Sequence, residues 1–282
     1  MININNLCFS YTKQPFIEDI SFCVEKGEIF GFLGPSGAGK STIQKILIGM
    51  LPNYTGSAIV NNTEVKEHTN KFFEHIGVDF EYPSLYEKLT ARQNLEFFAS
   101  LYKGERYSAD ELLSATGLLR DANKRVSEYS KGMKSRLSFI KSLIHKPKIL
   151  FLDEPTSGLD PSNSRIMKDI IIAQKESGTT IILTTHNMED AAELCDRVAF
   201  IVDGKIKALD TPHNLIMQKG AKTLRYSFLH NEKEIFSEIE MACMSEDKEL
   251  RELISQNKLM TIHSSEPNLG DIFIEVTGRR LS

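Results

Sequence analysis

The segment that most restricts the fold of this chain is a glycine-rich loop placed between a strand pattern and a helix pattern. Residues Ile29–Leu33 form an apolar run of strand length, and Ile43, Ile46 and Leu47 follow with helical spacing. The nine residues between them, Gly34–Thr42, have the spacing of a phosphate-binding loop. This order of strand, loop and helix predicts an α/β fold with a parallel core sheet.

The loop predicts contacts to a nucleoside triphosphate. Its glycines allow backbone N–H groups to approach phosphate oxygens at the positive end of the following helix. We expect Lys40 to reach the β and γ phosphates, Ser41 to bind Mg²⁺, and Thr42 to contact the region of the α phosphate. The predicted phosphate-contacting residues are Gly34, Pro35, Ser36, Gly37, Ala38, Gly39, Lys40, Ser41 and Thr42.

A second apolar strand pattern lies within Lys148–Glu154 and carries two carboxylates, Asp153 and Glu154, at its carboxyl end. Ligands of open α/β sheets bind at the carboxyl ends of the strands, so these acids are predicted to face the same nucleotide. We expect Asp153 to hold Mg²⁺ through water. Glu154 is then available as the general base that orients the attacking water and takes its proton.

The remaining sequence predicts how the chain is organised around this loop. Short strand patterns between Ile2 and Glu28 predict an antiparallel sheet, and residues 84–145 are mostly helical in pattern. Apolar strands return at Thr179–Thr185 and Val198–Val202, which favours parallel pairing through crossover connections. Asp203-Gly204 indicates a hairpin after the last of these strands.

The pattern changes near residue 220, where we place a domain boundary. Residues 1–220 form the predicted nucleotide-binding domain, with a helical subdomain over about 84–145, and residues 221–282 form a small accessory domain. Within the latter, alternation at Leu224, Tyr226 and Phe228 predicts a strand. Two helix patterns follow it, so an α+β appendage is expected rather than disorder.

At this point the sequence resembles the ATP-binding-cassette (ABC) ATPases over about residues 2–220. Tyr129–Met133 is similar to the signature segment of that family, Pro155–Asp160 to the loop after the catalytic acid, and Thr184–His186 to the segment with the switch histidine. Tyr11 lies where the family has an aromatic residue that stacks on adenine. The resemblance implies an α/β P-loop NTPase with a parallel core sheet, an antiparallel β subdomain, a helical subdomain and a small C-terminal α+β appendage.

The resemblance also implies roles for residues outside the phosphate loop. Two cassettes would sandwich two ATP molecules head to tail, with Ser130 and Gly132 of one copy facing the phosphates held by the other. Ser130 is expected to be the N-cap of the helix that contains Met133 and Ile144. His186 would hydrogen-bond the γ phosphate, and Asp160 would belong to the nucleotide-binding set. The expected catalytic residues are therefore Glu154, His186 and Lys40.

Three residues depart from the family pattern. Lys131 and Met133 replace the commoner Gly and Gln of the signature segment, and Glu81 replaces a Gln that contacts Mg²⁺ and water. A carboxylate can still offer oxygen to Mg²⁺, so the expected metal ligands are Ser41, Glu81 and Asp153. Because Glu81 adds negative charge near the triphosphate, we expect weaker ATP binding or a greater dependence on Mg²⁺ unless a cation compensates.

Further features predict the cellular role. The formal net charge of −4 argues against a nucleic-acid partner, and no membrane-spanning segment or secretory signal is expected. The segment Glu81–Leu95 resembles the region that receives short cytoplasmic helices of a permease, although its apolar side chains could equally belong to the core. The end of the chain, Pro267–Leu281, is similar to ATPase subunits of bacterial exporters.

We therefore expect an ATPase subunit that powers the export of drugs, antibiotics or peptides. Its partners would be a second ABC ATPase subunit, as a homodimer, and a separate integral-membrane permease. It would be a cytoplasmic protein, peripheral on the inner face of the cell membrane. The alternative is a soluble ABC-type ATPase or ATP sensor not coupled to transport, and the presence of Glu154 and His186 argues against the sensor.

Overall fold

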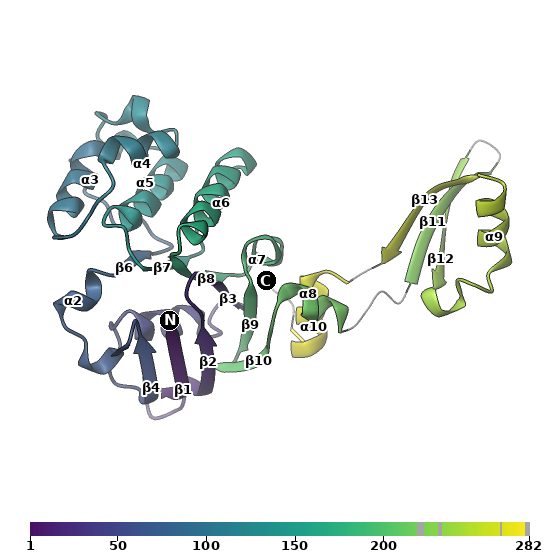
Figure 1. Cartoon of the computed structure of the whole chain (residues 1–282), viewed down its shortest axis with the longest axis horizontal. Helices are drawn as coiled ribbons and strands as arrows, with labels where there is room; N and C mark the ends of the chain where they lie inside the picture. Colours follow the sequence, from purple (N-terminus) through teal and green to yellow (C-terminus); the bar gives the residue numbers. More distant parts are fainter. Residues whose placement is uncertain (219–222, 231–232, 266, 280–282) are drawn as a thin grey trace. The chain divides into compact units, whose positions relative to one another are not determined.

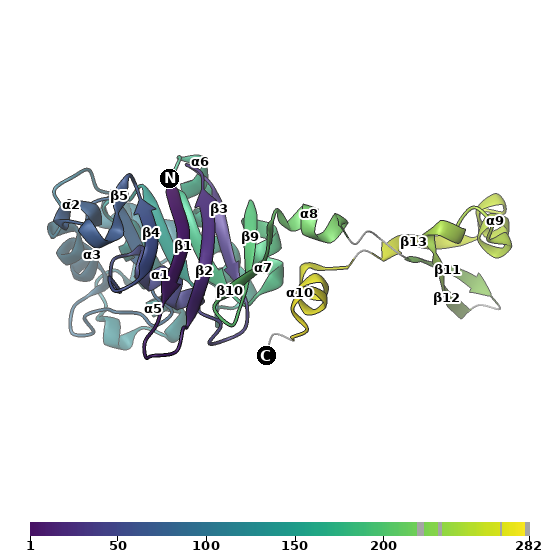
Figure 2. The same cartoon turned by 90° about the horizontal axis from the view of Figure 1, so that it is seen from below.

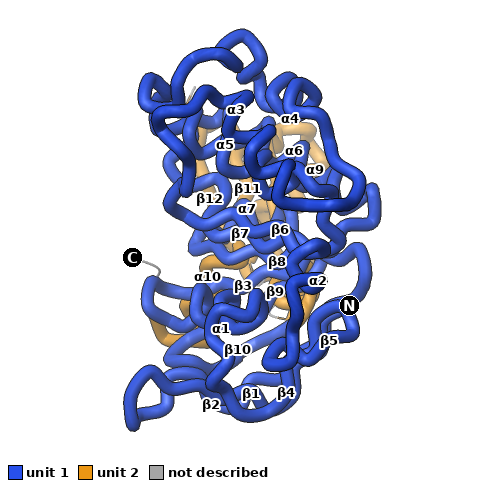
Figure 3. The backbone as a smooth tube through the Cα atoms, turned by 90° about the vertical axis from the view of Figure 1, so that its left-hand side faces the viewer, with its two compact units in different colours: residues 1–209, 281–282 blue, residues 210–280 orange. Residues whose placement is uncertain are grey.

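The computed structural model describes residues 1–218, 223–230, 233–265 and 267–279, in two compact units (Figure 1, Figure 3). The first unit is Met1–Leu209, and the second lies within residues 210–280. The predicted boundary between residues 220 and 221 lies outside the described residues, as do residues 280–282 of the tail. The short helix α8 (Pro212–Met217) groups with the second unit rather than with the nucleotide-binding part.

The centre of the first unit is a six-stranded sheet in the order β10-β9-β3-β8-β7-β6. Parallel pairing joins β3 to β8 and β9, and β7 to β6 and β8, as the sequence predicted. All five residues of β3 are buried. The strands are β3 (Ile29–Leu33), β6 (Ile76–Asp79), β7 (Ile149–Asp153), β8 (Thr180–Thr185), β9 (Arg197–Val202) and β10 (Lys205–Asp210).

A second, antiparallel sheet packs against this core. Its order is β2-β1-β4-β5, and Figure 2 shows β1, β2 and β4 side by side. The ring of Phe22 lies 5.2 Å from that of Phe30 and 5.3 Å from that of Phe32, so the two sheets share one apolar core. The strands are β1 (Ile2–Phe9), β2 (Ile17–Val24), β4 (Thr55–Val60) and β5 (Thr63–Glu64). The pairing of β1 with β2 was predicted, whereas the addition of β4 was not.

The helical part of the first unit lies within the expected residues 84–145 and contains α3, α4 and α5, which Figure 1 shows together. Thr90 and Gln93 form a capping box at the start of α3. The helices of this unit are α1 (Lys40–Leu47), α2 (Asn70–Phe73), α3 (Ala91–Ser100), α4 (Ala109–Ala115), α5 (Lys131–Leu143), α6 (Pro161–Glu176) and α7 (Met188–Leu194), with 3₁₀ turns at Val65–Glu67, Leu119–Asp121 and Val126–Glu128.

The second unit has the predicted α+β character. Its three strands have the order β12-β11-β13, and Leu224, Tyr226 and Phe228 of β11 are buried with Leu250 of α9. Helices α8 and α10 contact each other within this unit. Besides α8, its elements are β11 (Thr223–His230), β12 (Lys233–Glu240), a 3₁₀ turn at Met241–Cys243, α9 (Lys248–Ser255), β13 (Leu259–Ser265) and α10 (Leu269–Thr277).

Among the described residues, none of the helices combines the length and the apolar character needed to cross a bilayer.

Candidate nucleotide-binding site

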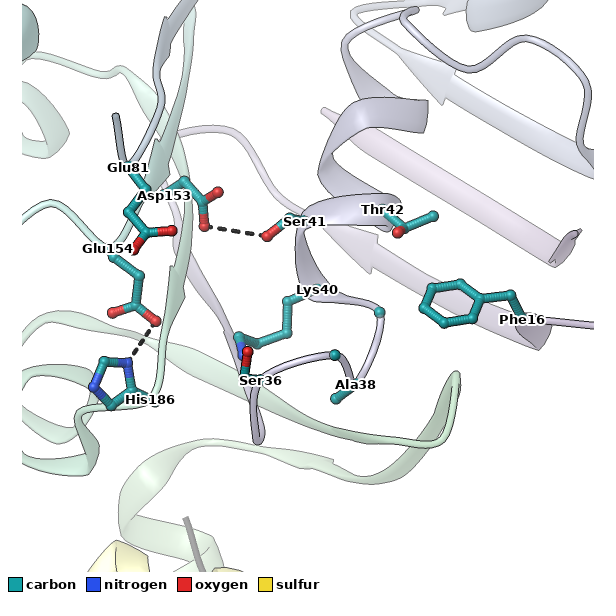
Figure 4. Close-up of a pocket in the computed structure, with 12 residues that line it drawn as sticks. Phe16, Ser36, Ala38, Lys40, Ser41, Thr42, Glu81, Asp153, Glu154 and His186 are labelled. Atoms are coloured by element: carbon teal, nitrogen blue, oxygen red, sulfur yellow. Dashed lines mark hydrogen bonds and ion pairs between the residues drawn. The ribbon is translucent and has the colours of Figure 1, made fainter. Parts of the chain in front are cut away.

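The carboxyl ends of β3 and β7 open onto a cavity of about 270 Å³ (Figure 4). The segment Ser36–Thr42 lines one side of it. Glu81, Asp153, Glu154 and His186 line the rest, together with the ring of Phe16. The structure therefore brings together most of the phosphate loop and four side chains predicted from distant parts of the sequence.

Close backbone packing fixes the beginning of the phosphate loop. A Cβ atom at Gly34 would lie 2.1 Å from the carbonyl oxygen of Ile201 on β9, so only glycine fits there. Gly39 has φ 111° at the N-cap of α1, a left-handed conformation that other residues rarely adopt. The loop consequently reaches α1 with its backbone exposed to the cavity rather than covered by side chains.

Lys40 is the buried cation of this cavity, with 8% of its surface exposed. Its Nζ donates hydrogen bonds to the carbonyl oxygens of Gly34 at 2.6 Å and Pro35 at 3.1 Å. Burial lowers the pKa of Lys40, whereas the nearby carboxylates of Glu154 and Asp153 act to raise it. A negatively charged phosphate would favour the ammonium form further.

The oxygen atoms at the end of β7 suit Mg²⁺. Ser41 Oγ lies 3.5 Å from Asp153 Oδ1, and Thr184 also hydrogen-bonds Asp153. Within the described ranges, no three His, Cys, Asp or Glu side chains are grouped closely enough to hold a metal by themselves. A hydroxyl and one or two carboxylates that leave the other positions to water and phosphate are the usual protein share of a Mg²⁺ site, so these residues fit the ion.

Glu154 is held from two sides directly after β7. Thr185 Oγ1 donates to its Oε2 at 3.0 Å, and His186 Nδ1 lies 2.8 Å from its Oε1. The backbone of Glu154 has φ 51°, an unfavourable value for a residue with a side chain. Strain of this kind is tolerated where surrounding contacts enforce it, and it concentrates at functional sites. The arrangement aims one oriented carboxylate into the cavity.

Ser130, Gly132 and Asp160 are not among the residues that line this cavity. Ser130 is the N-cap of α5, as predicted, and accepts a hydrogen bond from the backbone N–H of Met133 at 3.3 Å. Asp160 caps α6 in the same way, and its hydrogen bonds from Asn163 lower the pKa of the carboxyl. Ser130 and Asp160 therefore each cap the start of a helix, outside the cavity.

Tyr11 lies beside the cavity rather than on its wall. Its hydroxyl is 3.1 Å from Thr42 Oγ1, and its ring contacts Phe16 edge-on with 5.4 Å between centroids. Phe16 lines the cavity itself and was missed by the sequence analysis. A second aromatic residue five positions after Tyr11, at the start of a strand, was the signal that could have indicated it.

This fold and this cavity define a P-loop nucleotide-binding protein. A profile of the ABC transporter family matches residues 17–157. The chain is 48% identical over 285 residues to a fluoroquinolones export ATP-binding protein of Mycobacterium tuberculosis (strain CDC 1551 / Oshkosh), with 100% of this chain and 95% of the relative covered. It is 31% identical over 309 residues to the linearmycin resistance ATP-binding protein LnrL of Bacillus subtilis (strain 168), with 100% and 99% covered.

A solved structure agrees with these sequence matches. The chain is similar to an ATP-binding cassette solved as a dimer in a post-hydrolysis state with ADP and Pi, with a TM-score of 0.66 and 25% identity over 75% of this chain and 98% of that one. The chain belongs to the ABC transporter family, and it is an ATP-hydrolysing subunit of that family's cassette type.

Proposed function

We propose that this chain is the ATPase subunit of an exporter of drugs, antibiotics or peptides, and that it works with a separate membrane permease. ATP hydrolysis is supported by the oriented carboxylate of Glu154, which faces the same cavity as Lys40 and is held by Thr185 and His186. The names of two relatives that match across the whole chain, an export protein and a resistance protein, support export as the direction.

Binding of ATP would use the phosphate loop and its lysine. Backbone N–H groups of Ser36–Thr42 would surround the β and γ phosphates, and Lys40 would exchange its bonds to the loop carbonyls for bonds to phosphate. Ser41, Asp153 and Glu81 would hold Mg²⁺, which when bound neutralises charge on the phosphates. Phe16 offers a ring at the cavity wall, and Tyr11 lies next to it as the second aromatic residue.

Hydrolysis would depend on Glu154 and His186. The Glu154 carboxylate would orient a water molecule toward the γ phosphate and accept its proton, as a general base does. His186 would hold that carboxylate through its Nδ1, which leaves its other ring nitrogen available for the γ phosphate. Thr185 keeps the second carboxylate oxygen in place, so the base approaches in one orientation.

A second copy of the chain would complete each site. Ser130 and Gly132, at the start of α5, would face the phosphates bound by the other copy, and Asp160 would lie in the loop between the two sites. Helix N-termini favour negatively charged ligands because their N–H groups are unpaired. The dimeric state in which the related cassette was solved supports this arrangement.

The permease would dock on the segment after β6. Tyr82 is 79% exposed and Tyr86 is 51% exposed, so neither ring is part of the core and both are available to a partner. This is the segment where the sequence predicts that short cytoplasmic helices of the membrane partner bind. Through it, the subunit would be peripheral on the cytoplasmic face of the cell membrane.

The hydrolytic role is tested by the ATPase activity of the Glu154→Gln variant. The variant keeps the size of the side chain and its contact with Thr185 but removes the proton acceptor. We expect it to bind ATP and to lose turnover, with ATP-bound dimers accumulating. If the wild-type protein bound ATP without hydrolysing it, and Glu154→Gln changed nothing, the ATP-sensor alternative would be correct.

The transport role needs a separate experiment with the membrane partner. The chain would be co-expressed with a six-span hydrophobic protein encoded beside it, and the membrane protein would be purified. We expect the ATPase to co-purify, and candidate cargo to stimulate ATP hydrolysis by the complex. Hydrolysis without any membrane partner or any stimulation would favour a soluble ABC-type ATPase.

A further inference from the structure

Two residues that depart from the family pattern, Glu81 and Lys131, face the same small cavity of about 30 Å³. Glu81 follows β6 by two residues, and Lys131 is the first residue of α5. Glu81 also lines the nucleotide cavity. Its carboxylate therefore stands at the boundary between the nucleotide and the space that Lys131 faces.

The other carboxyl groups of this small cavity already have partners. Asp79 accepts a hydrogen bond from Ser138 Oγ at 2.7 Å, and Asp153 and Glu154 are bonded by the threonines at the end of β8. Glu81 has no hydrogen bond or ion pair with any residue that the structure describes. The same is true of Lys131, which is the one cationic side chain lining this cavity in the described part of the chain.

The position of Lys131 keeps its charge near these acids. A Cβ atom built on Gly158 would lie 3.4 Å from Lys131 Nζ, so the ammonium group rests against the loop that follows Glu154. The charge of Glu81 also acts on Lys40, whose pKa it raises against the effect of burial, so the carboxylate can interact with either of two lysines. Its attraction to Lys131 depends on how much water separates the two charges. Both side chains are exposed and line this cavity, so each is free to change rotamer.

We propose that Lys131 is a positioning residue that draws the Glu81 carboxylate out of the nucleotide cavity and releases it when the start of α5 engages the nucleotide of a second copy. This inference rests on the proposed function, because it assumes that the N-terminus of α5 meets phosphate from another copy. Lys131 would then exchange Glu81 for that phosphate. The freed carboxylate would turn back toward the Mg²⁺ side of its own nucleotide.

This exchange would couple the binding of a second copy to the availability of the Glu81 carboxylate in the first copy. In this structure of a single copy Glu81 lines the nucleotide cavity, and a move to Lys131 before a second copy binds would remove its negative charge from the space in which the triphosphate must bind. After it binds, Glu81 becomes available as an oxygen ligand at the moment when the site is complete. A lysine and a glutamate at these two positions thus act as a unit, and replacing either one alone leaves a charge without its partner.

The test is a double-mutant cycle on nucleotide binding by the full-length protein. The probe is the non-hydrolysable analogue AMP-PNP, measured at protein concentrations below dimer formation, once with Mg²⁺ and once with EDTA. We expect Lys131→Gln to weaken AMP-PNP binding about three- to tenfold in EDTA, because Glu81 then repels the triphosphate. In Mg²⁺ the loss should be smaller, since the ion can use the free carboxylate.

Lys131→Gln made in a Glu81→Gln background should have no effect on AMP-PNP affinity. Lys134→Gln is the matched control, because Lys134 is on the same helix but pairs with Glu87 at 2.6 Å outside both cavities, and it should leave affinity unchanged. Lys131→Arg keeps the charge and should behave as the wild type. The coupling should also shrink at high salt, because partly exposed charges are screened.

Equal effects of Lys131→Gln in the wild-type and the Glu81→Gln backgrounds, or no effect in either, would overturn the inference while leaving the proposed function intact. If the wild-type protein failed to bind AMP-PNP at all, the proposed function itself would be wrong. A loss seen with both Lys131→Gln and Lys131→Arg would show that the side chain serves folding rather than Glu81.

Discussion

His186 Nδ1 lies 2.8 Å from Glu154 Oε1, although the two residues follow different strands and are 32 positions apart. Strands β7 and β8 are parallel neighbours, and their register pairs Asp153 with Thr184. The residues that follow each strand therefore meet at the carboxyl edge of the sheet, where an α/β protein binds its ligand. The contact joins the proposed general base to the residue that orients it.

His186→Ala is predicted to reduce turnover far more than ATP binding. Glu154 would lose one of its two orienting hydrogen bonds, while the phosphate loop would remain intact. We expect kcat to fall about a hundredfold with little change in the affinity for ATP. Steady-state ATPase assays and equilibrium binding measure the two quantities, and His213→Ala, an exposed histidine on α8, is the control. An equal loss in binding and turnover would assign His186 to nucleotide binding alone.

Gly34→Ala is predicted to disrupt the phosphate loop. The new Cβ would lie 2.1 Å from the Ile201 carbonyl oxygen, so the loop or β9 would have to move. We expect a lower melting temperature and loss of ATP binding. Gly37→Ala is the matched comparison, since no atom lies within 4 Å of its Cβ position. Its φ of 77° should cost only about 1 kcal/mol, so a Gly34→Ala protein no worse than Gly37→Ala would contradict the packing argument.

Asp79 is predicted to make stability depend on pH. Burial raises the pKa of Asp79 to about 7, although its bond from Ser138 opposes this. A carboxyl with a raised pKa holds its proton in the folded state after the unfolded chain has lost it. The free energy of unfolding should therefore fall as pH rises from the unfolded pKa, about 4, toward 7, by a few kcal/mol, and then level off.

The Asp79→Asn variant isolates this contribution. It keeps an oxygen acceptor for Ser138 and cannot ionise, so its stability should be flatter between pH 4 and pH 7. Denaturant unfolding of both proteins across this range gives the difference. If the two curves stayed parallel, Asp79 would not titrate in this window.

The sequence predicted those residues of the site whose position depends on their neighbours along the chain. Ser130 precedes its helix as an N-cap, the phosphate loop joins a strand to a helix, and Glu154 directly follows a strand, so neighbouring residues were enough to place each of them. Because parallel strands end at the same edge of a sheet, the segments that follow them lie close together. For this reason the prediction of a parallel core sheet with these segments at its carboxyl edge was correct.

Features that depend on pairing between distant segments were not predictable in the same way. Strand β4 joins β1 across more than 40 residues, and nothing in the pattern of Thr55–Val60 selects that partner. Phe16 reaches the cavity because β2 begins beside the phosphate loop. Likewise, the sequence marked Glu81 and Lys131 as unusual, but only the packing of α5 against β6 and the loop after β7 places them on one cavity.

The central claim is that ATP bound by the loop of one copy is completed by Ser130 of another. Its most direct test is the oligomeric state of Glu154→Gln with MgATP, compared with Glu154→Gln carrying Ser130→Asp or Ser130→Asn. Both replacements cap a helix well, but only aspartate puts a negative charge where phosphate would lie.

The measurement is the mass of each variant in solution, together with its affinity for ATP as a monomer. We predict ATP-dependent dimers for Glu154→Gln and for Glu154→Gln with Ser130→Asn. For Glu154→Gln with Ser130→Asp we predict monomers that still bind ATP. Dimers of equal stability in all three proteins, or loss of ATP binding by the Ser130→Asp monomer, would contradict it.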